Sequence, residues 1–200
     1  NGTIAIGFQS LNALTSGAGN VAVGYEALKT EDVGSGNVAV GYQALETCNN
    51  DTGYNVAIGY DAMQACADAY FTIAIGKDAG KNISGGRASS VIIGHEAGDG
   101  AIATDGLVFI GRSAGGANTS GGANLAIGYQ ALAANTTGGD NTMIGYQAGV
   151  SANDSGFSTN VGVGNYVFDG VLGYDVARNV AVGYGSLSGA MVDAADGNTA

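Results

Sequence analysis

The residue types that carry most enzyme chemistry are scarce in this 200-residue chain. It has one His and two Cys, and it lacks the phosphate-binding loop that ends in Gly-Lys-Ser/Thr. The acids Asp99, Asp105, Asp140 and Asp154 are irregularly spaced in polar segments, which is a weak basis for a calcium site. We therefore expect a non-enzymatic protein with no resident metal or cofactor.

The two cysteines occupy equivalent positions. Cys48 and Cys66 each lie seven residues after a recurring glycine, Gly41 and Gly59. If these glycines mark successive turns of one coil, the cysteines are neighbours about 4.8 Å apart, within the Cα separation that a disulfide accepts. We predict that they form a disulfide in an oxidising compartment and stay reduced elsewhere.

A column of aromatic and cationic residues follows the recurring glycine. A row of rings can bind sugars, because ring faces pack against C–H groups, or it can pack within and between chains, which we favour. In the middle copies the position becomes cationic, which indicates solvated pairs with neighbouring carboxylates, or a site for an acidic sugar. The tyrosines are Tyr25, Tyr42, Tyr60, Tyr129, Tyr146 and Tyr184, and the cations are Lys77, His95 and Arg112.

Asn-x-Ser/Thr sequons recur in the polar connections. They are candidate glycosylation sites if the host modifies such sequences, although a chain this rich in Asn, Ser and Thr supplies several by chance. The candidates in the connections are Asn50, Asn82, Asn118, Asn135 and Asn153.

These positions all belong to one internal repeat. The segment Asn-Val-Ala-Val-Gly-Tyr-Glu-Ala-Leu at 20–28 returns with small changes at 37–45, 55–63 and 124–132. Eleven copies are aligned by a central glycine, with spacings of 17 to 19 residues. We expect one repeat array over 1–200 that continues beyond both ends, because a twelfth copy begins at 198–200.

Each copy predicts a short strand. Branched aliphatic residues stand three and one positions before the glycine, as in Val21 and Val23, with a small residue between them. This period of two predicts a strand whose aliphatic face is buried, then a second short extended piece and a polar turn. So small a unit cannot bury its own core, so the copies should stack as about eleven rungs of an all-β parallel solenoid. The apolar insertion at 167–172 should pack back on the solenoid or onto a neighbour.

An Asn column stands four residues before the glycine. Stacked amides can hydrogen-bond to the next rung and fix the register, or each Asn can simply form a turn at the strand entrance. Both interpretations stay open. The column comprises Asn20, Asn37, Asn55, Asn124, Asn141, Asn160 and Asn179.

Charge and composition exclude several classes of protein. Six Lys and Arg oppose 17 Asp and Glu, a net charge of −11, so a nucleic acid backbone would be repelled. No run of 18 or more apolar residues is present, which predicts no membrane insertion. The 37 glycines come without proline or a Gly-X-Y period, which excludes collagen.

The sequence Ala-Leu-Ala-Ala-Asn-Thr-Thr-Gly-Gly-Asp-Asn-Thr-Met-Ile-Gly-Tyr-Gln-Ala-Gly at 131–149 resembles the Asn-Thr-Ala-Ile-Gly-Tyr arrays of phage and algal-virus tail fibres. It is also similar to the heads of trimeric autotransporter adhesins, whose Ser-Val-Ala-Ile-Gly repeats are shorter. The resemblance spans essentially the whole chain. It implies a left-handed parallel β-roll, a homotrimer, and an extracellular, cell-surface or virion location.

The resemblance and the repeat together predict a structural and adhesive fibre segment. It would build a stalk or head, associate with itself and display binding to a receptor such as a cell-surface glycan. The alternative is a monomeric solenoid that binds carbohydrate or ice. Ice binding usually needs a regular Thr array, whereas Thr is scattered here.

Overall fold

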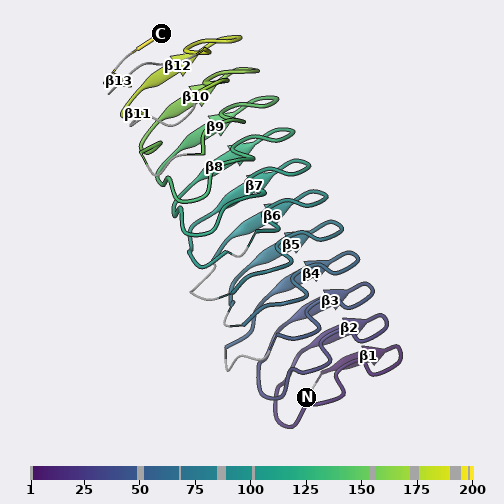
Figure 1. Cartoon of the computed structure of the whole chain (residues 1–200). Helices are drawn as coiled ribbons and strands as arrows, with labels where there is room; N and C mark the ends of the chain where they lie inside the picture. The colour runs from purple at the N-terminus through teal and green to yellow at the C-terminus, as the bar shows by residue number, and fades with distance from the viewer. Residues whose placement is uncertain are drawn as a thin grey trace.

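The structure is a computed structural model that describes residues 2–48, 52–67, 69–84, 89–100, 102–153, 156–171, 176–189, 195–197 and 199–200. These residues contain strands and turns and no helix. Eleven short strands form one parallel sheet in chain order, and the chain coils about ten times between the first and the last. The result is an elongated stack with the termini at opposite ends (Figure 1). The predicted all-β parallel solenoid is therefore confirmed.

Each rung contributes one strand of three residues to the main sheet. Two further short strands, β11 (Val176–Ala177) and β13 (Ala195–Asp196), pair on another side of the coil. The strands of the main sheet are β1 (Ile4–Ile6), β2 (Val21–Val23), β3 (Val38–Val40), β4 (Val56–Ile58), β5 (Ile73–Ile75), β6 (Val91–Ile93), β7 (Val108–Ile110), β8 (Leu125–Ile127), β9 (Thr142–Ile144), β10 (Val161–Val163) and β12 (Val180–Val182).

The register follows the repeat without a slip. Val21 pairs with Val38, Val38 with Val56, Val56 with Ile73 and Ile73 with Val91. Equal offset from the rung glycine therefore means vertical adjacency throughout the main sheet. The predicted columns are confirmed, so the alignment of the copies can be used to place every other residue.

The rung glycines allow the chain to turn sharply after each strand. Gly24 has φ +145°, and a Cβ built on it would collide with the backbone carbonyl of Gly41 on the next rung. Only glycine fits this close approach of two backbones. The following segment is a turn and not the expected second strand. It still bonds from rung to rung, for example from Leu28 N to Ala44 O at 3.0 Å.

The burial of the strands corrects one expectation. The middle residue of each strand points inward in β2 to β10 and β12, and Ala22, Ala39 and Ala57 are fully buried. The flanking aliphatic residues, predicted to be buried, point outward instead. The core is also filled from the turns, by an Ala and, on several rungs, a Leu that lie three and four residues after the rung glycine, such as Ala44 and Leu45.

The longer last repeats also contribute to the core. Val167, Phe168 and Val171 are buried, as expected for an insertion that packs back on the solenoid. Phe168 meets Phe157 edge to face, with ring centroids 5.6 Å apart. Leu172 lies outside the described residues.

Candidate interaction surface

The outer side of the main sheet carries two exposed columns of aliphatic side chains, which we call the aliphatic face. It consists of the first and third residues of β1 to β10 and β12. Every position is Val, Ile or Leu except Thr142, and none is charged. Val40 is 36% exposed and Ile6 60% exposed, and the other members are intermediate or exposed as well.

The aliphatic face is larger than the apolar patches that monomeric proteins usually expose. Eleven rungs at about 4.8 Å span about 50 Å. Single exposed aliphatic residues need no explanation, but monomeric soluble proteins rarely expose a continuous apolar patch larger than a few hundred Å². A strip of this length without one charge, on a chain of net charge −11, is therefore a candidate interaction surface.

The predicted tyrosine column borders the aliphatic face and forms stacked rings. The Tyr25 and Tyr42 centroids are 5.1 Å apart with planes 6° apart, and Tyr42 and Tyr60 are 4.9 Å apart. Tyr129 and Tyr146 stack in the same way at 5.0 Å. Because stacked rings largely cover each other's faces, the column offers mainly ring edges and hydroxyl groups to a ligand. This geometry favours packing over a sugar platform.

The ring column continues at the last rungs by a route that the sequence did not suggest. Asn165 takes the position after the rung glycine, and its Oδ1 accepts a hydrogen bond from Tyr146 N at 2.9 Å. The next residue, Tyr166, fills the gap with edge contacts to Tyr146 and Tyr184, at 5.4 and 5.5 Å.

The three cations sit between the two tyrosine stacks. Lys77 lies over the Tyr60 ring at 5.6 Å and pairs with Asp78, while Arg112 lies over the Tyr129 ring at 5.5 Å. His95 lies between them along the column, and its Nδ1 is 3.4 Å from Glu96 Oε2. These three side chains therefore contact rings and carboxylates of their own chain.

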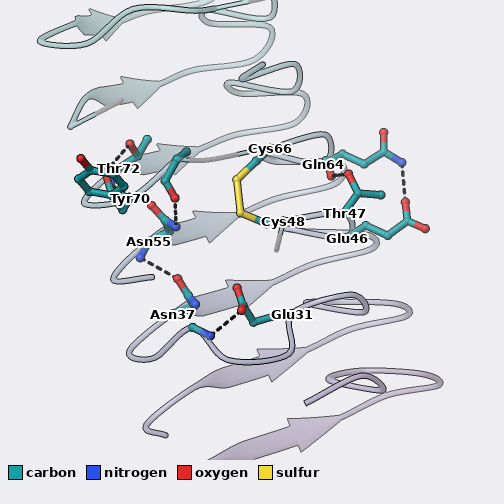
Figure 2. The surroundings of a disulfide bond; sticks show 12 residues. Glu31, Asn37, Glu46, Thr47, Cys48, Asn55, Gln64, Cys66, Tyr70 and Thr72 are labelled. Atoms are coloured by element: carbon teal, nitrogen blue, oxygen red, sulfur yellow. Dashed lines mark hydrogen bonds between the residues drawn. A yellow bond between two sulfur atoms is a disulfide. The ribbon is translucent and has the colours of Figure 1, made fainter. Parts of the chain in front are cut away.

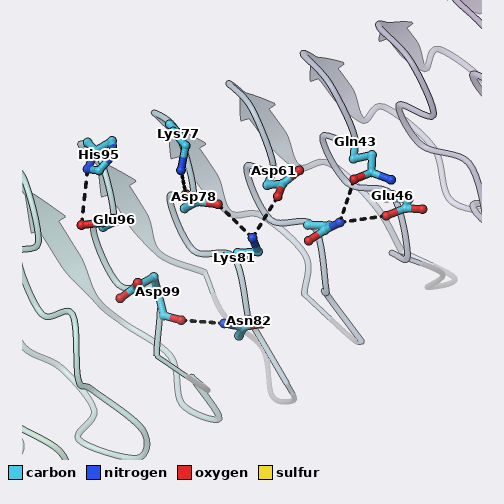
Figure 3. A network of polar contacts seen from close by, with 11 residues as sticks. Gln43, Glu46, Asp61, Lys77, Asp78, Lys81, Asn82, His95, Glu96 and Asp99 are labelled. Atoms are coloured by element: carbon cyan, nitrogen blue, oxygen red, sulfur yellow. Dashed lines mark hydrogen bonds and ion pairs between the residues drawn. The ribbon is translucent and has the colours of Figure 1, made fainter.

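Behind this border, a network of carboxylates, amides and lysines runs along the turns (Figure 3). Lys81 Nζ bridges two rungs, 2.9 Å from Asp61 Oδ2 and 3.0 Å from Asp78 Oδ1. The Asp61 contact and then the Asp78 contact raise the pKa of Lys81 to about 12. Asp78 is partly buried, which raises its pKa, but Lys77 and Lys81 outweigh burial and hold it below the usual value.

The segment Gly-Arg-Ser-Ala-Gly at 111–115 has the Gly-x-Ser-x-Gly spacing of a hydrolase elbow. Ser113 lies 3.5 Å from Glu96 Oε2, and the same carboxylate oxygen faces His95. In a catalytic triad the imidazole lies between the serine and the acid, so that it can take the serine proton. Here the carboxylate lies between them. The φ of +54° at Ser113 recurs at Glu26 and Gln43 and belongs to the repeat.

The Asn column lies inside the coil and links the rungs. The Oδ1 of Asn20 accepts a hydrogen bond from Asn37 N at 2.8 Å, and that of Asn124 accepts one from Asn141 N at 3.0 Å. The Nδ2 of Asn124 donates to Gly138 O at 2.8 Å. These bonds support the predicted role in fixing the register. The middle rungs depart from it, with Thr72, Ser90 and Leu107.

Cys48 and Cys66 meet inside the coil, joined by a disulfide across adjacent rungs, with Cα atoms 4.6 Å apart (Figure 2). Both are almost fully buried. Glu31 occupies the equivalent position one rung earlier and is also buried, with Oε1 accepting a hydrogen bond from Gly34 N at 2.7 Å. The signal for a carboxylate in this column is present in the sequence, because Glu31 lies seven residues after Gly24, the same offset as that of the two cysteines.

Two of the candidate glycosylation sites lie inside the folded chain. The side chains of Asn118 and Asn135 are buried, and Asn135 Nδ2 donates to Gly138 O at 2.8 Å. A glycan on that nitrogen would break the bond and has no room inside the coil. Asn82 and Asn153 are exposed and stay candidates, while Asn50 lies outside the described residues.

Among the described residues, no three His, Cys, Asp or Glu side chains gather as a metal site would require. Within the same part of the chain, no helix has the length and apolar character needed to cross a membrane. The chain matches no model of a known protein family, and no curated protein or solved structure matches it significantly.

Proposed function

We propose that this chain is a structural and adhesive segment of an extracellular, cell-surface or virion-attached fibre, with no enzymatic activity. The aliphatic face carries the proposal, because a long uncharged strip on an acidic chain needs a partner that covers it. Another copy of this chain has rungs of the same height, so the two faces match rung by rung. Side-by-side association of copies would make a rigid rod.

The available surface is large enough for a stable contact. Five residues from the far edge of the strand to the Tyr border cover about 16 Å, which over about 50 Å of rungs gives about 800 Å². Stable protein interfaces bury about 800 Å² on each partner. The similarity to adhesin heads favours three copies in left-handed coils, and a buried disulfide suits a compartment outside the cell. Receptor binding, for example to a glycan, would then use surfaces that assembly leaves open.

The test is the mass of the protein in solution. Sedimentation equilibrium should give three times the 19.5 kDa of the chain, independent of loading concentration down to low micromolar. A monodisperse monomer would overturn the proposal. A trimer that resists SDS would strengthen it, since it would indicate an extensive apolar contact.

The second candidate is a monomeric solenoid that binds ice or carbohydrate, which the flat and regular aliphatic face also suits. Only Thr142 interrupts the face with a hydroxyl. A monomer that inhibits ice recrystallisation, or that binds an insoluble polysaccharide, would support this candidate. A monomer with neither activity would exclude both.

A further inference from the structure

Three cations follow one another at a corner of the coil, next to the aliphatic face. Lys77, His95 and Arg112 occupy the same position on the fifth, sixth and seventh rungs, and all three side chains are exposed. The chain has six Lys and Arg and one His. This column therefore holds almost half of its basic residues within about 10 Å, the height of two rung steps.

The same three rungs also depart from the repeat inside the coil. From the second rung to the eleventh, the Asn column is interrupted only at Thr72, Ser90 and Leu107, which belong to these rungs. Departures from the local rules of a fold concentrate at functional or strained sites. Because the inner and the outer column change together, the fifth to seventh rungs form a distinct segment of the array.

The carboxylates near this corner lie mostly beneath the cations. Asp61 and Asp78 are buried, and Lys81 Nζ lies 2.9 and 3.0 Å from their oxygens (Figure 3). Glu96 is more exposed, at 41% of its side chain, and faces His95. A ligand that approaches the corner therefore meets positive groups first, on a chain that is acidic elsewhere.

Arg112 is the cation best placed for a ligand. The next residue is Ser113, at the position that Asp78 and Glu96 occupy on the two preceding rungs. In the part of the chain that the structure describes, no carboxylate forms an ion pair with Arg112, whose guanidinium lies over the Tyr129 ring. A guanidinium over a ring still presents its N–H donors in its own plane, and this fork matches the two oxygens of a carboxylate.

The rungs that follow Arg112 offer neutral polar groups. Ser113, Gln130 and Gln147 continue the column that is acidic on the preceding rungs, and Gln147 Nε2 donates to Gln130 Oε1 at 2.8 Å. Hydroxyl and amide groups hydrogen-bond to sugar hydroxyls, which both donate and accept. A densely charged polyanion such as nucleic acid would be repelled by a net charge of −11. Separate carboxylates between uncharged hydroxyl groups suit this corner better.

We propose that this corner binds a polysaccharide that carries carboxylate groups, with one carboxylate on Arg112 and the polymer lying along the stack. Lys77 and His95 face its next acidic groups, while Ser113 and Gln130 contact its hydroxyl groups. The inference gives a ligand class to the receptor binding of the proposed function and rests on it in that respect alone, since one chain carries the whole site.

The site lies at the edge of the surface that a second copy would cover. Lys77 contacts Asp78 and His95 contacts Glu96, so both charged groups turn from the strands towards the polar network. The rims of protein interfaces are polar and accessible to solvent. Assembly through the aliphatic face is therefore compatible with a ligand at this corner.

Binding of the folded protein to immobilised polygalacturonate, measured by surface plasmon resonance, tests the inference. Dextran is the neutral control, and dextran sulfate separates carboxylates from other anions. The wild-type protein should bind polygalacturonate and should not bind dextran. Absence of binding to polygalacturonate, equal binding to dextran, or tighter binding to dextran sulfate would each overturn the proposed ligand class.

Two substitutions at the site have a matched control. Arg112→Gln should weaken binding about tenfold or more, because hydrogen bonds to charged groups contribute that much. Ser113→Glu should weaken it as well, since it supplies the neighbouring carboxylate that Arg112 lacks. Arg178→Gln makes the same change in net charge at an exposed residue on the other side of the strands, and should leave the affinity unchanged. If the control weakened binding as much as Arg112→Gln, or if both site variants bound like the wild type, the assignment of the site would be wrong.

Sedimentation equilibrium of the same samples separates this inference from the proposed function. Self-associated protein that does not bind polygalacturonate leaves the fibre proposal standing and removes the inference. A monomer whose binding depends on Arg112 removes the fibre proposal and leaves the inference standing. Melting temperatures close to that of the wild type show that a variant with lost affinity is still folded.

Discussion

The ring of Phe109 fills the space that a side chain on Gly115 would need. A Cβ built on Gly115 would lie 2.5 Å from Phe109 Cδ2, well inside van der Waals contact. Phe109 is the inward-facing middle residue of β7, and Gly115 is four residues after the rung glycine. The two positions share one volume in the core.

The same pair of positions is filled in two ways along the coil. Where the middle strand residue is Ala, as in Ala22 and Ala126, the position four residues after the rung glycine holds a buried Leu, Leu28 and Leu132. The fifth rung is the exception, with Ala74 and Gly80, and there Ile83 and Ile92 lie against the glycine. Where the strand residue is large, as in Met143, the partner is glycine, Gly149. Close packing of a narrow core allows one large side chain from either wall but not two.

This exchange predicts a coupled pair of mutations. Phe109→Ala leaves a cavity and should lower the free energy of unfolding by about 3–5 kcal/mol. Gly115→Leu overfills the same space and should lower it by about 1–3 kcal/mol or more. The double variant rebuilds the Ala and Leu arrangement of other rungs, so it should be more stable than the sum of the single effects by at least about 1 kcal/mol. Chemical denaturation of the four proteins measures this coupling.

A control pair uses positions that do not touch. Phe109→Ala combined with Gly149→Leu joins two rungs about 10 Å apart, and its effects should add. Additive effects in the Phe109 and Gly115 pair as well would show that the two residues do not compete for one space.

The Asn ladder yields a second prediction. Asn124→Ala removes the acceptor for Asn141 N, which is left buried without a partner, and one of the two donors to Gly138 O, which keeps its bond from Asn135 Nδ2. The free energy of unfolding should fall by about 1–3 kcal/mol, the cost of one unsatisfied buried group. Asn124→Ser should cost less, because Ser90 in this column accepts a hydrogen bond from Leu107 N at 3.1 Å.

Asn82→Ala is the matched control for the ladder. Asn82 also donates to a backbone oxygen on the next rung, Asp99 O at 2.8 Å, but it is exposed. Its loss should change stability by less than about 0.5 kcal/mol, because water replaces the bond. If Asn124→Ala were equally mild, the ladder would not fix the register.

The repeat spacing was enough to predict the rungs and their register, because parallel stacking converts equal offset into adjacency. It was not enough to decide which side of each strand faces inward. A strict alternation such as Val21-Ala22-Val23 describes both choices equally well, and the hydrophobic effect alone favours burying Val. The exchange between Phe109 and Gly115 was the available signal, since positions that trade size across repeats must be in contact.

The conformation of the turns and the contacts of the polar network could not be predicted from the sequence. Gln43 and Leu45 adopt φ of +50° and +54°, which their residue types do not indicate, so the sequence wrongly predicts a strand in the segment after the glycine. The backbone of the neighbouring rung imposes this conformation. The contact of Lys81 with both Asp61 and Asp78 depends on how these turns fold, and the sequence shows only that the charges are near in the repeat.

The carboxylates around Lys81 give a prediction on pH. The pKa of Asp78 is lowered in the folded chain, so its contribution to stability is present above its unfolded pKa and is lost as the pH falls through the folded value. The pKa of Lys81 is raised to about 12, so its contribution is full below its unfolded value and is lost as the pH rises through about 12. Lys81→Met should therefore lower the melting temperature at pH 7, because Asp61 loses its cation and Asp78 keeps only Lys77.

The loss should shrink between pH 4 and pH 2, since protonated carboxyl groups no longer need the cation. Thermal melts of wild-type and Lys81→Met protein over this range measure the difference. Arg112→Met is the control, because Arg112 lies over the Tyr129 ring and its effect should change little with pH. A Lys81→Met effect that stays constant down to pH 2 would contradict the role of the two carboxylates.

The disulfide between Cys48 and Cys66 yields the last prediction. It links residues 18 apart, for which the loss of chain entropy in the unfolded state suggests about 3 kcal/mol of stabilisation. For a chain of this size, that corresponds to a melting temperature about 6–12 °C lower once the bond is absent. Protein refolded with a reductant, compared with protein refolded under oxidising conditions, should show this shift, while Cys48→Ala with Cys66→Ala should melt at one temperature in both. Thiol labelling confirms the state of the pair, and a fully labelled protein that melts like the oxidised one would show that the bond adds no stability.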